Sequence, residues 1–278
     1  MSDSSRSSHH ALPAPQTRQA AFFDLDKTII ATNSAFAFGK QFMHNGLISH
    51  SEALQISLAK ASFMMSGLSS EQMDSTRDQM AELVTGWEVD EVVRIAREAL
   101  HTVVTPTIYA EARELIRYHR AAGRDVIIIS ASASQLVSLI GEELGVHDIV
   151  ATELEVVDGK FTGEILTYLK GGAKAEAMKK LAQERGYDMS ASFAYSDSAT
   201  DIPMLELVGN PVAVNPDRQM KKTALENGWE IRSFRDPVPL LQLPNAREIS
   251  IGAGVLAGLA AVTAGGIWFA QRNRPNAS

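Results

Sequence analysis

Five short apolar runs alternate with longer helical patterns along the middle of the chain, and this alternation constrains the fold more than any other feature. The runs read AAFFDL, DVIIIS, DIVAT, SFAYS and PVAV. Stretches such as TIYAEARELIRYHRAAG and AKAEAMKKLAQERG lie between them, and each closes on a glycine suited to a helix C-cap. Strands that alternate with helices predict an α/β fold, a doubly wound parallel sheet with helices on both faces. Ligands of such sheets bind beyond the carboxyl ends of the strands.

Two further segments add detail to this fold. The stretch ELEVVDGKFTGE alternates about Asp158-Gly159 and predicts a hairpin. Between the first and second apolar runs, residues 34–104 show no strand pattern and are predicted to be helical. An insertion at that point would sit above the strand ends as a helical cap.

Polar side chains stand at or just after the ends of the predicted strands, and we expect them to meet at one edge of the sheet. They are, in chain order, Asp24, Asp26, Thr28, Ser130, Lys174, Asp197 and Asp201. Taken singly, such residues are usually turns, caps or solvated charges, but their order along successive strands favours a common site. Four carboxylates in one crevice repel strongly unless a divalent cation and a lysine offset their charge. Oxygen ligands in an open, water-containing site suit Mg²⁺ better than Zn²⁺.

A phosphoryl group is the natural substrate for a metal ion and a lysine placed in this way. Asp24 can attack phosphorus and form an aspartyl-phosphate, which divides one hard hydrolysis into two steps. Asp26 can protonate the leaving oxygen and then deprotonate water, a role that needs its pKa raised by the neighbouring carboxylate and by partial desolvation. Ser130 and Lys174 would hold the non-bridging oxygens. The predicted function is a Mg²⁺-dependent phosphomonoester hydrolase.

The order of these motifs resembles that of a known family. FDLDKT, which ends on Thr28, is similar to the first motif, DxDx[TV], of the haloacid dehalogenase-like (HAD) phosphatases. IIIS, Lys174 and SDSATD are similar to the second, third and fourth motifs. The resemblance covers about residues 20–235 and implies a Rossmann-like core, with Thr28 just outside the metal ligands. The helical insertion resembles the C1-type cap of the phosphoserine phosphatase-like branch, subfamily IB.

The resemblance also implies a role for each matching residue. Asp24 would be the nucleophile and Asp26 the acid/base. Mg²⁺ would be held by Asp24, by the backbone carbonyl of Asp26 and by Asp197. Asp201 would lie behind these ligands and orient Lys174 or a metal-bound water.

The chain departs from the phosphoserine phosphatase pattern in several places. Asn33 stands where those enzymes carry a glutamate for the substrate ammonium, and residues 41–76 contain no arginine for its carboxylate. The second motif usually reads S-G-G where this chain has S-A-S, and Ser196 replaces the first glycine of the fourth motif. We therefore expect the hydrolytic chemistry to be kept and phosphoserine not to be the preferred substrate.

These observations predict how the chain is divided. The serine- and proline-rich start has no apolar core, so it is predicted to be a disordered tail and not a signal peptide. The predicted parts are a tail over 1–19, a phosphatase core over 20–34 and 105–235, a helical cap over 35–104, a linker over 236–248 and a transmembrane anchor over 249–270.

Residues 249–270 carry no charge, and 22 residues of helix would be about 33 Å long, enough to cross a bilayer. The alternative is a buried helix of the soluble domain. An anchor would place the protein at the cell membrane in a single pass, with the catalytic domain in the cytoplasm. Gly254-x-x-x-Gly258 could pair two such helices into a homodimer.

Composition limits the possible partners. A net charge of −7, with no stretch dense in Lys and Arg, argues against nucleic acid, and the absence of cysteine excludes thiol catalysis and zinc–thiolate sites. The expected substrate is a phosphorylated small molecule, and the alternative is the head group of a phosphorylated lipid. A non-catalytic regulatory protein on a HAD fold is the competing class. The complete set of candidate residues favours an enzyme.

Overall fold

The computed structural model describes residues 18–49 and 81–235, which all belong to the unit Met1–Val238. The predicted linker, the predicted anchor and almost all of the predicted tail lie outside the described residues, as do residues 50–80 of the predicted cap. Among the described residues, no helix is both long and apolar enough to cross a membrane.

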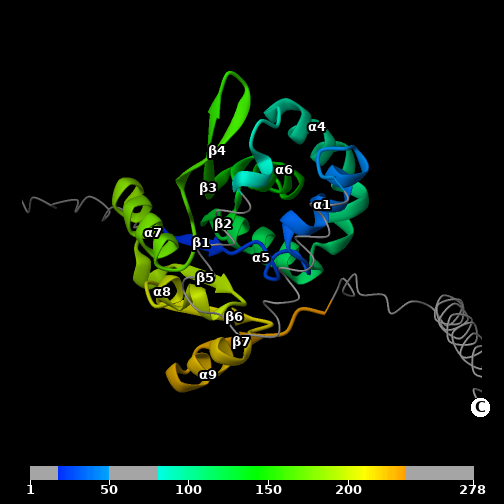
Figure 1. The fold of residues 1–278 in the computed structure, drawn as a ribbon. Helices are drawn as coiled ribbons and strands as arrows, with labels where there is room; N and C mark the ends of the chain where they lie inside the picture. The colour runs from blue at the N-terminus through cyan, green and yellow to red at the C-terminus, as the bar shows by residue number, and fades with distance from the viewer. Residues whose placement is uncertain (1–17, 50–80, 236–278) are drawn as a thin grey trace, which may run out of the picture. The chain divides into compact units, whose positions relative to one another are not determined.

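The predicted parallel sheet is confirmed (Figure 1). The described residues form one seven-stranded sheet in the order β4-β3-β2-β1-β5-β6-β7, in which every pairing is parallel except that of β3 with β4. The strands are β1 (Ala20–Phe23), β2 (Asp125–Ala133), β3 (Asp148–Val157), β4 (Lys160–Thr167), β5 (Phe193–Ser196), β6 (Asn210–Val214) and β7 (Glu230–Arg232). The five apolar runs are β1, β2, the start of β3, β5 and β6. Because central parallel strands are covered on both faces, their apolar residues are continuous.

Helices cover the sheet on both faces, and β1 shows how the sequence specifies this. Ala21 and Phe23 pack in one buried cluster, which also contains residues of α1, α4, α5 and α6. Ala20 and Phe22 point the other way, into a cluster with residues of α7, α8 and α9. The helices are α1 (Ser34–His44), α4 (Val89–Ala99), α5 (Ala110–Ala121), α6 (Ser134–Leu144), α7 (Gly172–Arg185), α8 (Ile202–Leu205) and α9 (Arg218–Asn227). Successive side chains of a strand point to opposite faces, so a four-residue strand contributes to both cores.

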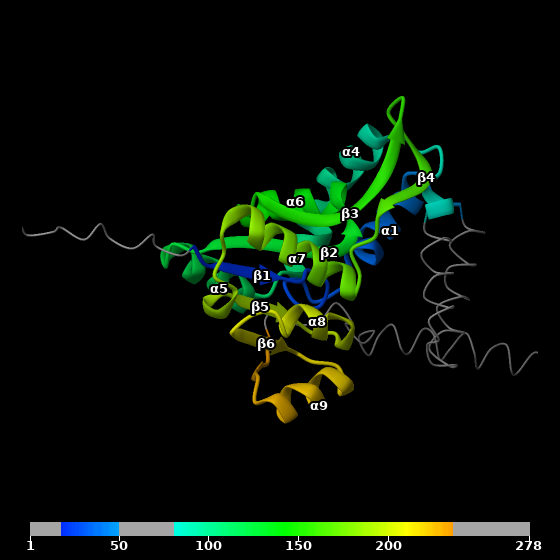
Figure 2. The same cartoon turned by 90° about the vertical axis from the view of Figure 1, so that its left-hand side faces the viewer.

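The predicted hairpin is also confirmed. Asp158 and Gly159 connect β3 to β4 with φ values of 51° and 80°, as a two-residue hairpin turn requires. The hairpin projects beyond the other strands (Figures 1 and 2). It contacts the segment that leads into α4, where Lys160 forms a 3.0 Å ion pair with Glu88.

The described part of the insertion consists of helices, as predicted. α1 follows β1, and α4 continues through a π-helical turn, η1 (Leu100–Val104), and a 3₁₀ turn, η2 (Thr105–Thr107), before the chain returns to α5. Phe38 of α1 and Val92 of α4 belong to the same buried cluster as Phe23 of β1. Both helices pack against α6 as well as against each other.

Candidate active site

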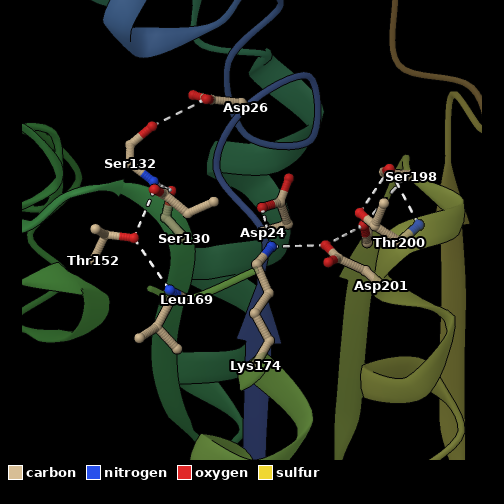
Figure 3. A network of polar contacts seen from close by, with 12 residues as sticks. Asp24, Asp26, Ser130, Ser132, Thr152, Leu169, Lys174, Ser198, Thr200 and Asp201 are labelled. Carbon is tan, nitrogen blue, oxygen red and sulfur yellow. Dashed lines mark hydrogen bonds and ion pairs between the residues drawn. The ribbon is translucent and has the colours of Figure 1, made fainter. Parts of the chain in front are cut away.

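The site lies at the carboxyl ends of β1, β2 and β5 and is centred on Lys174 (Figure 3). Lys174 occupies the first turn of α7 and is 3% exposed. Its Nζ donates to Asp24 Oδ1 at 2.6 Å and to Asp201 Oδ2 at 2.7 Å. Asp24 directly follows β1, and Asp201 ends the 3₁₀ turn η4 (Ala199–Asp201) beyond β5. Three residues that are far apart in the sequence are therefore joined by charge-assisted hydrogen bonds.

The charges of this cluster shift the pKa values of its members. Burial lowers the pKa of Lys174, but Asp24 and Asp201 outweigh it, so this pKa lies above its ordinary value. Burial raises the pKa of Asp24, and Asp201 and Asp197 add to the rise while Lys174 opposes it. The lysine is thus held as a cation, whereas the nearby carboxylates have more negative charge than one lysine offsets.

Asp197 is a buried carboxylate of the site whose negative charge is not paired with a neighbouring cation in the part of the chain that the structure describes. It follows β5, is 8% exposed and forms no salt bridge with any described residue. Burial raises its pKa to about 7, with Lys27 opposing and Asp201 adding to the rise. A buried carboxylate of this kind either takes up a proton or binds a cation.

The carboxylates at this edge of the sheet suit an open magnesium site better than a closed one. The described part of the chain contains no group of three or more His, Asp or Glu side chains able to hold a metal. The set implied by the resemblance has only two such side chains, Asp24 and Asp197, and takes its third ligand from a backbone carbonyl. Mg²⁺ usually keeps several waters and needs only one or two protein carboxylates. Two buried carboxylates with raised pKa values therefore fit Mg²⁺, although they would not make a closed structural site.

Asp26 is held by the residues around the start of α1 and the end of β2. Its carboxylate accepts hydrogen bonds from the Ser34 amide at 2.9 Å, from Asn33 Nδ2 at 2.8 Å and from Ser132 Oγ at 3.1 Å. Its pKa is raised, as predicted, but burial is the cause and the neighbouring carboxylate is not. Asn33 also caps α1, because its Oδ1 accepts from the Phe36 amide at 3.1 Å.

Ser130 and Ser132 are brought to the site by an irregularity in β2. The pairing of β2 with β3 shifts register between Ser130 and Ala133, as in a β-bulge. Ser130 is 1% exposed, and its Oγ accepts from the Ser132 amide at 3.1 Å. Both serines therefore face the site, and the contact of Ser132 with Asp26 was not predicted. The repeated serines of SASAS are the only sequence signal for it.

Ser196 and Thr28 complete the buried polar groups. Ser196, which replaces the usual glycine, donates from Oγ to Asp201 Oδ2 at 2.8 Å, so Asp201 is fixed from two sides. Thr28 is fully buried, and its Oγ1 has no hydrogen-bond partner among the described residues. An unpaired buried hydroxyl at this position is available to a bound group or water.

Fold and site together define an α/β enzyme with a carboxylate–lysine centre at the carboxyl edge of its sheet. The sequence profile of the haloacid dehalogenase-like hydrolases matches residues 21–206. The chain belongs to this family, and within it the chain is a phosphatase of the phosphoserine phosphatase-like kind.

Three relatives match most of this chain, and two of them are named as phosphatases. The "inhibition of morphological differentiation protein" of Streptomyces azureus is 46% identical over 276 residues, which cover 96% of this chain and 97% of that protein. A "probable phosphatase" of Mycobacterium tuberculosis is 44% identical over 94% of this chain and 91% of its own length. A "phosphoserine phosphatase" of the same organism is 35% identical over 87% of this chain and 80% of its length.

The fold is also found among solved structures. A protein of unknown function from Bordetella pertussis Tohama I superposes with a TM-score of 0.69 at 27% identity, over 78% of this chain and 98% of that one. The match spans nearly the whole of that protein.

Proposed function

We propose that this protein is a Mg²⁺-dependent phosphomonoester hydrolase that forms an aspartyl-phosphate on Asp24. The observation that carries the proposal is Lys174, buried between Asp24 and Asp201 at the carboxyl edge of the sheet. A fully buried lysine with two carboxylates is costly to assemble, and stability gains little from it. A site that binds a phosphoryl dianion next to a carboxylate nucleophile needs such a cation.

Asp24 would attack phosphorus, with Lys174 Nζ fixing the orientation of its carboxylate through the 2.6 Å hydrogen bond. The same ammonium group and the hydroxyl of Ser130 would hold non-bridging oxygens of the phosphoryl group. Mg²⁺, when bound by Asp24, Asp197 and the backbone carbonyl of Asp26, would offset the negative charge of the phosphoryl oxygens.

Asp26 would donate a proton to the leaving oxygen as a general acid and would later accept a proton from the attacking water as a general base. Its raised pKa, caused by burial, favours the protonated form that the first step needs. The hydrogen bonds from Asn33 and Ser132 fix the direction of its carboxylate, so the proton is presented at one place.

The substrate would be a phosphorylated small molecule, and phosphoserine would not be the preferred one. The side chain of Asn33 is engaged with Asp26 and with the first turn of α1, so it does not act as a partner for an ammonium group. Asparagine also carries no charge, and a buried charged pairing is worth a few kcal/mol. Its loss should lower kcat/KM by about 10²-fold or more.

The test is a panel of phosphomonoesters, including phosphoserine and lysophosphatidate, hydrolysed by the full chain in the presence of MgCl₂. Asp24→Asn should abolish turnover and leave the fold intact, and a chelator should abolish it reversibly. Comparable activity in Asp24→Asn, or with excess chelator, would exclude the proposed chemistry. A large preference for phosphoserine over every other ester would overturn the substrate assignment alone.

A further inference from the structure

A buried hydroxyl links the two elements that carry the predicted phosphate-binding groups. Thr152 lies in β3 and is 4% exposed. Its Oγ1 donates to the Ala131 carbonyl at 2.7 Å and accepts from the Leu169 amide at 3.2 Å (Figure 3). A hydroxyl can do both at once, because it has one hydrogen and two lone pairs.

The first of these bonds fixes the irregular end of β2. Regular pairing with β3 joins Ser130 to Ala151 and resumes only at Ala133, so the ladder is interrupted at Ala131. The Ala131 carbonyl is instead bound by Thr152. Ser130 precedes this carbonyl, so the direction of its side chain depends on how the interruption is held.

The second bond fixes the loop that leads into α7. Leu169 follows β4, its side chain is 3% exposed, and its amide is bound by Thr152. The chain then turns through Gly171, which has a φ of 58° and lies beside the Thr200 carbonyl, and enters the first turn of α7. Lys174 is reached five residues after Leu169, so the start of this turn sets where its ammonium group lies.

The geometry points to Thr152 as a positioning residue that fixes the separation between Ser130 and Lys174. This inference rests on the proposed function, in which these two residues hold the oxygens of one phosphoryl group. Thr152 does not touch the substrate. It acts by keeping two elements at the spacing that a phosphoryl group requires, and a misplacement of about 1 Å can lower the rate about 10²-fold.

Ser192 provides a matched control at the opposite end of the sheet. It is fully buried, and its Oγ donates to the Asp188 carbonyl at 2.6 Å and accepts from the Ala20 amide at 3.0 Å. Its hydroxyl therefore joins two backbone segments as Thr152 does, but it does so at the start of β1 and β5. Removing either hydroxyl takes the acceptor from a backbone amide, that of Leu169 or that of Ala20, although the Asp188 carbonyl still accepts from the Ala191 amide at 3.2 Å.

The experiment compares Thr152→Val, Thr152→Ser and Ser192→Ala in the full chain. For each variant, kcat/KM with the best ester of the panel, the inhibition constant of inorganic phosphate and the melting temperature are measured. We expect Thr152→Val to lower kcat/KM by about 10²-fold and to weaken phosphate inhibition by about tenfold. Thr152→Ser keeps the hydroxyl and should restore most of both. Both Thr152→Val and Ser192→Ala should lower the melting temperature. Ser192→Ala should nevertheless leave kcat/KM and the inhibition constant of phosphate within about twofold of the wild type.

Two results would overturn the inference. If Thr152→Val melts lower but keeps the kcat/KM and phosphate inhibition of the wild type, Thr152 is structural only, and the proposed function stands. The same holds if Ser192→Ala loses phosphate inhibition to the same degree, because the effect then follows global stability. If the wild type neither hydrolyses any ester of the panel nor binds phosphate, the proposed function is wrong. The role of Thr152, which depends on it, is then wrong as well.

Discussion

Acidification should destabilise this protein through one histidine, His119 of α5. His119 is fully buried, and its Nε2 lies 2.8 Å from the hydroxyl oxygen of Tyr195. Its Nδ1 lies 3.4 Å from Nη1 of Arg124, which can only donate, so the neutral ring accepts there and carries its hydrogen on Nε2. Protonation would place a second N–H against the guanidinium group.

The pKa of His119 reflects this environment. Burial lowers it from 6.5 to about 4, and the charges of Arg124 and Arg232 contribute in the same direction. The unfolded chain therefore binds more protons than the folded one in the window between these two values. The stabilisation is fully present above pH 6.5 and is lost as the pH falls through the window toward 4. Between pH 7 and pH 4.5 the loss amounts to about 2 kcal/mol.

The assay is urea unfolding of the wild type and of His119→Gln at both pH values. Glutamine does not titrate, and its amide can still donate to Tyr195, so the variant isolates the protonation of the ring. Other groups that titrate, including Asp24 and Asp197, are common to both proteins and cancel in the comparison. The wild type should lose about 2 kcal/mol more than the variant on acidification. Equal losses would refute this account of His119.

Three other predictions concern packing, the site and the location of the protein. Gly209→Ala would drive its Cβ into the Ser190 carbonyl and should lower the free energy of unfolding by about 2 kcal/mol or more, whereas Gly39→Ala, in open space within α1, should be neutral or stabilising in the same urea titration. Ser196→Ala removes a hydrogen bond to Asp201 and should cost about 2 kcal/mol of stability; wild-type stability would contradict this. If the predicted C-terminal anchor is real, cell fractionation should find the full chain with membranes and a chain lacking that segment in the soluble fraction; two soluble chains would show that it is not an anchor.

The strand ends and the residues on them could be predicted from the sequence. A short apolar run followed by a carboxylate has few uses in a parallel sheet, and Asp24 and Asp197 lie directly after β1 and β5 as predicted. The position of Lys174 in the first turn of α7 was predictable for a similar reason, since a glycine pair marks the start of the helical pattern.

The supporting contacts could not be predicted, because they depend on register and on loop geometry. The shift between β2 and β3 determines that Ser132 reaches Asp26 and that Thr152 reaches Ala131, and no local pattern shows this shift. Asn33 was identified by its position in a motif, but its hydrogen bond to Asp26 depends on where α1 begins.

The most direct test of the central proposal is to trap the phosphorylated enzyme. The full chain is mixed with its best ester and MgCl₂, quenched in acid within the first turnover and analysed by peptide mass spectrometry. The proposal predicts one added phosphoryl group, labile to hydroxylamine, on the peptide that contains Asp24, and none in Asp24→Asn. A phosphoryl group on another residue, or turnover that inverts the configuration at phosphorus, as a single displacement by water does, would contradict it.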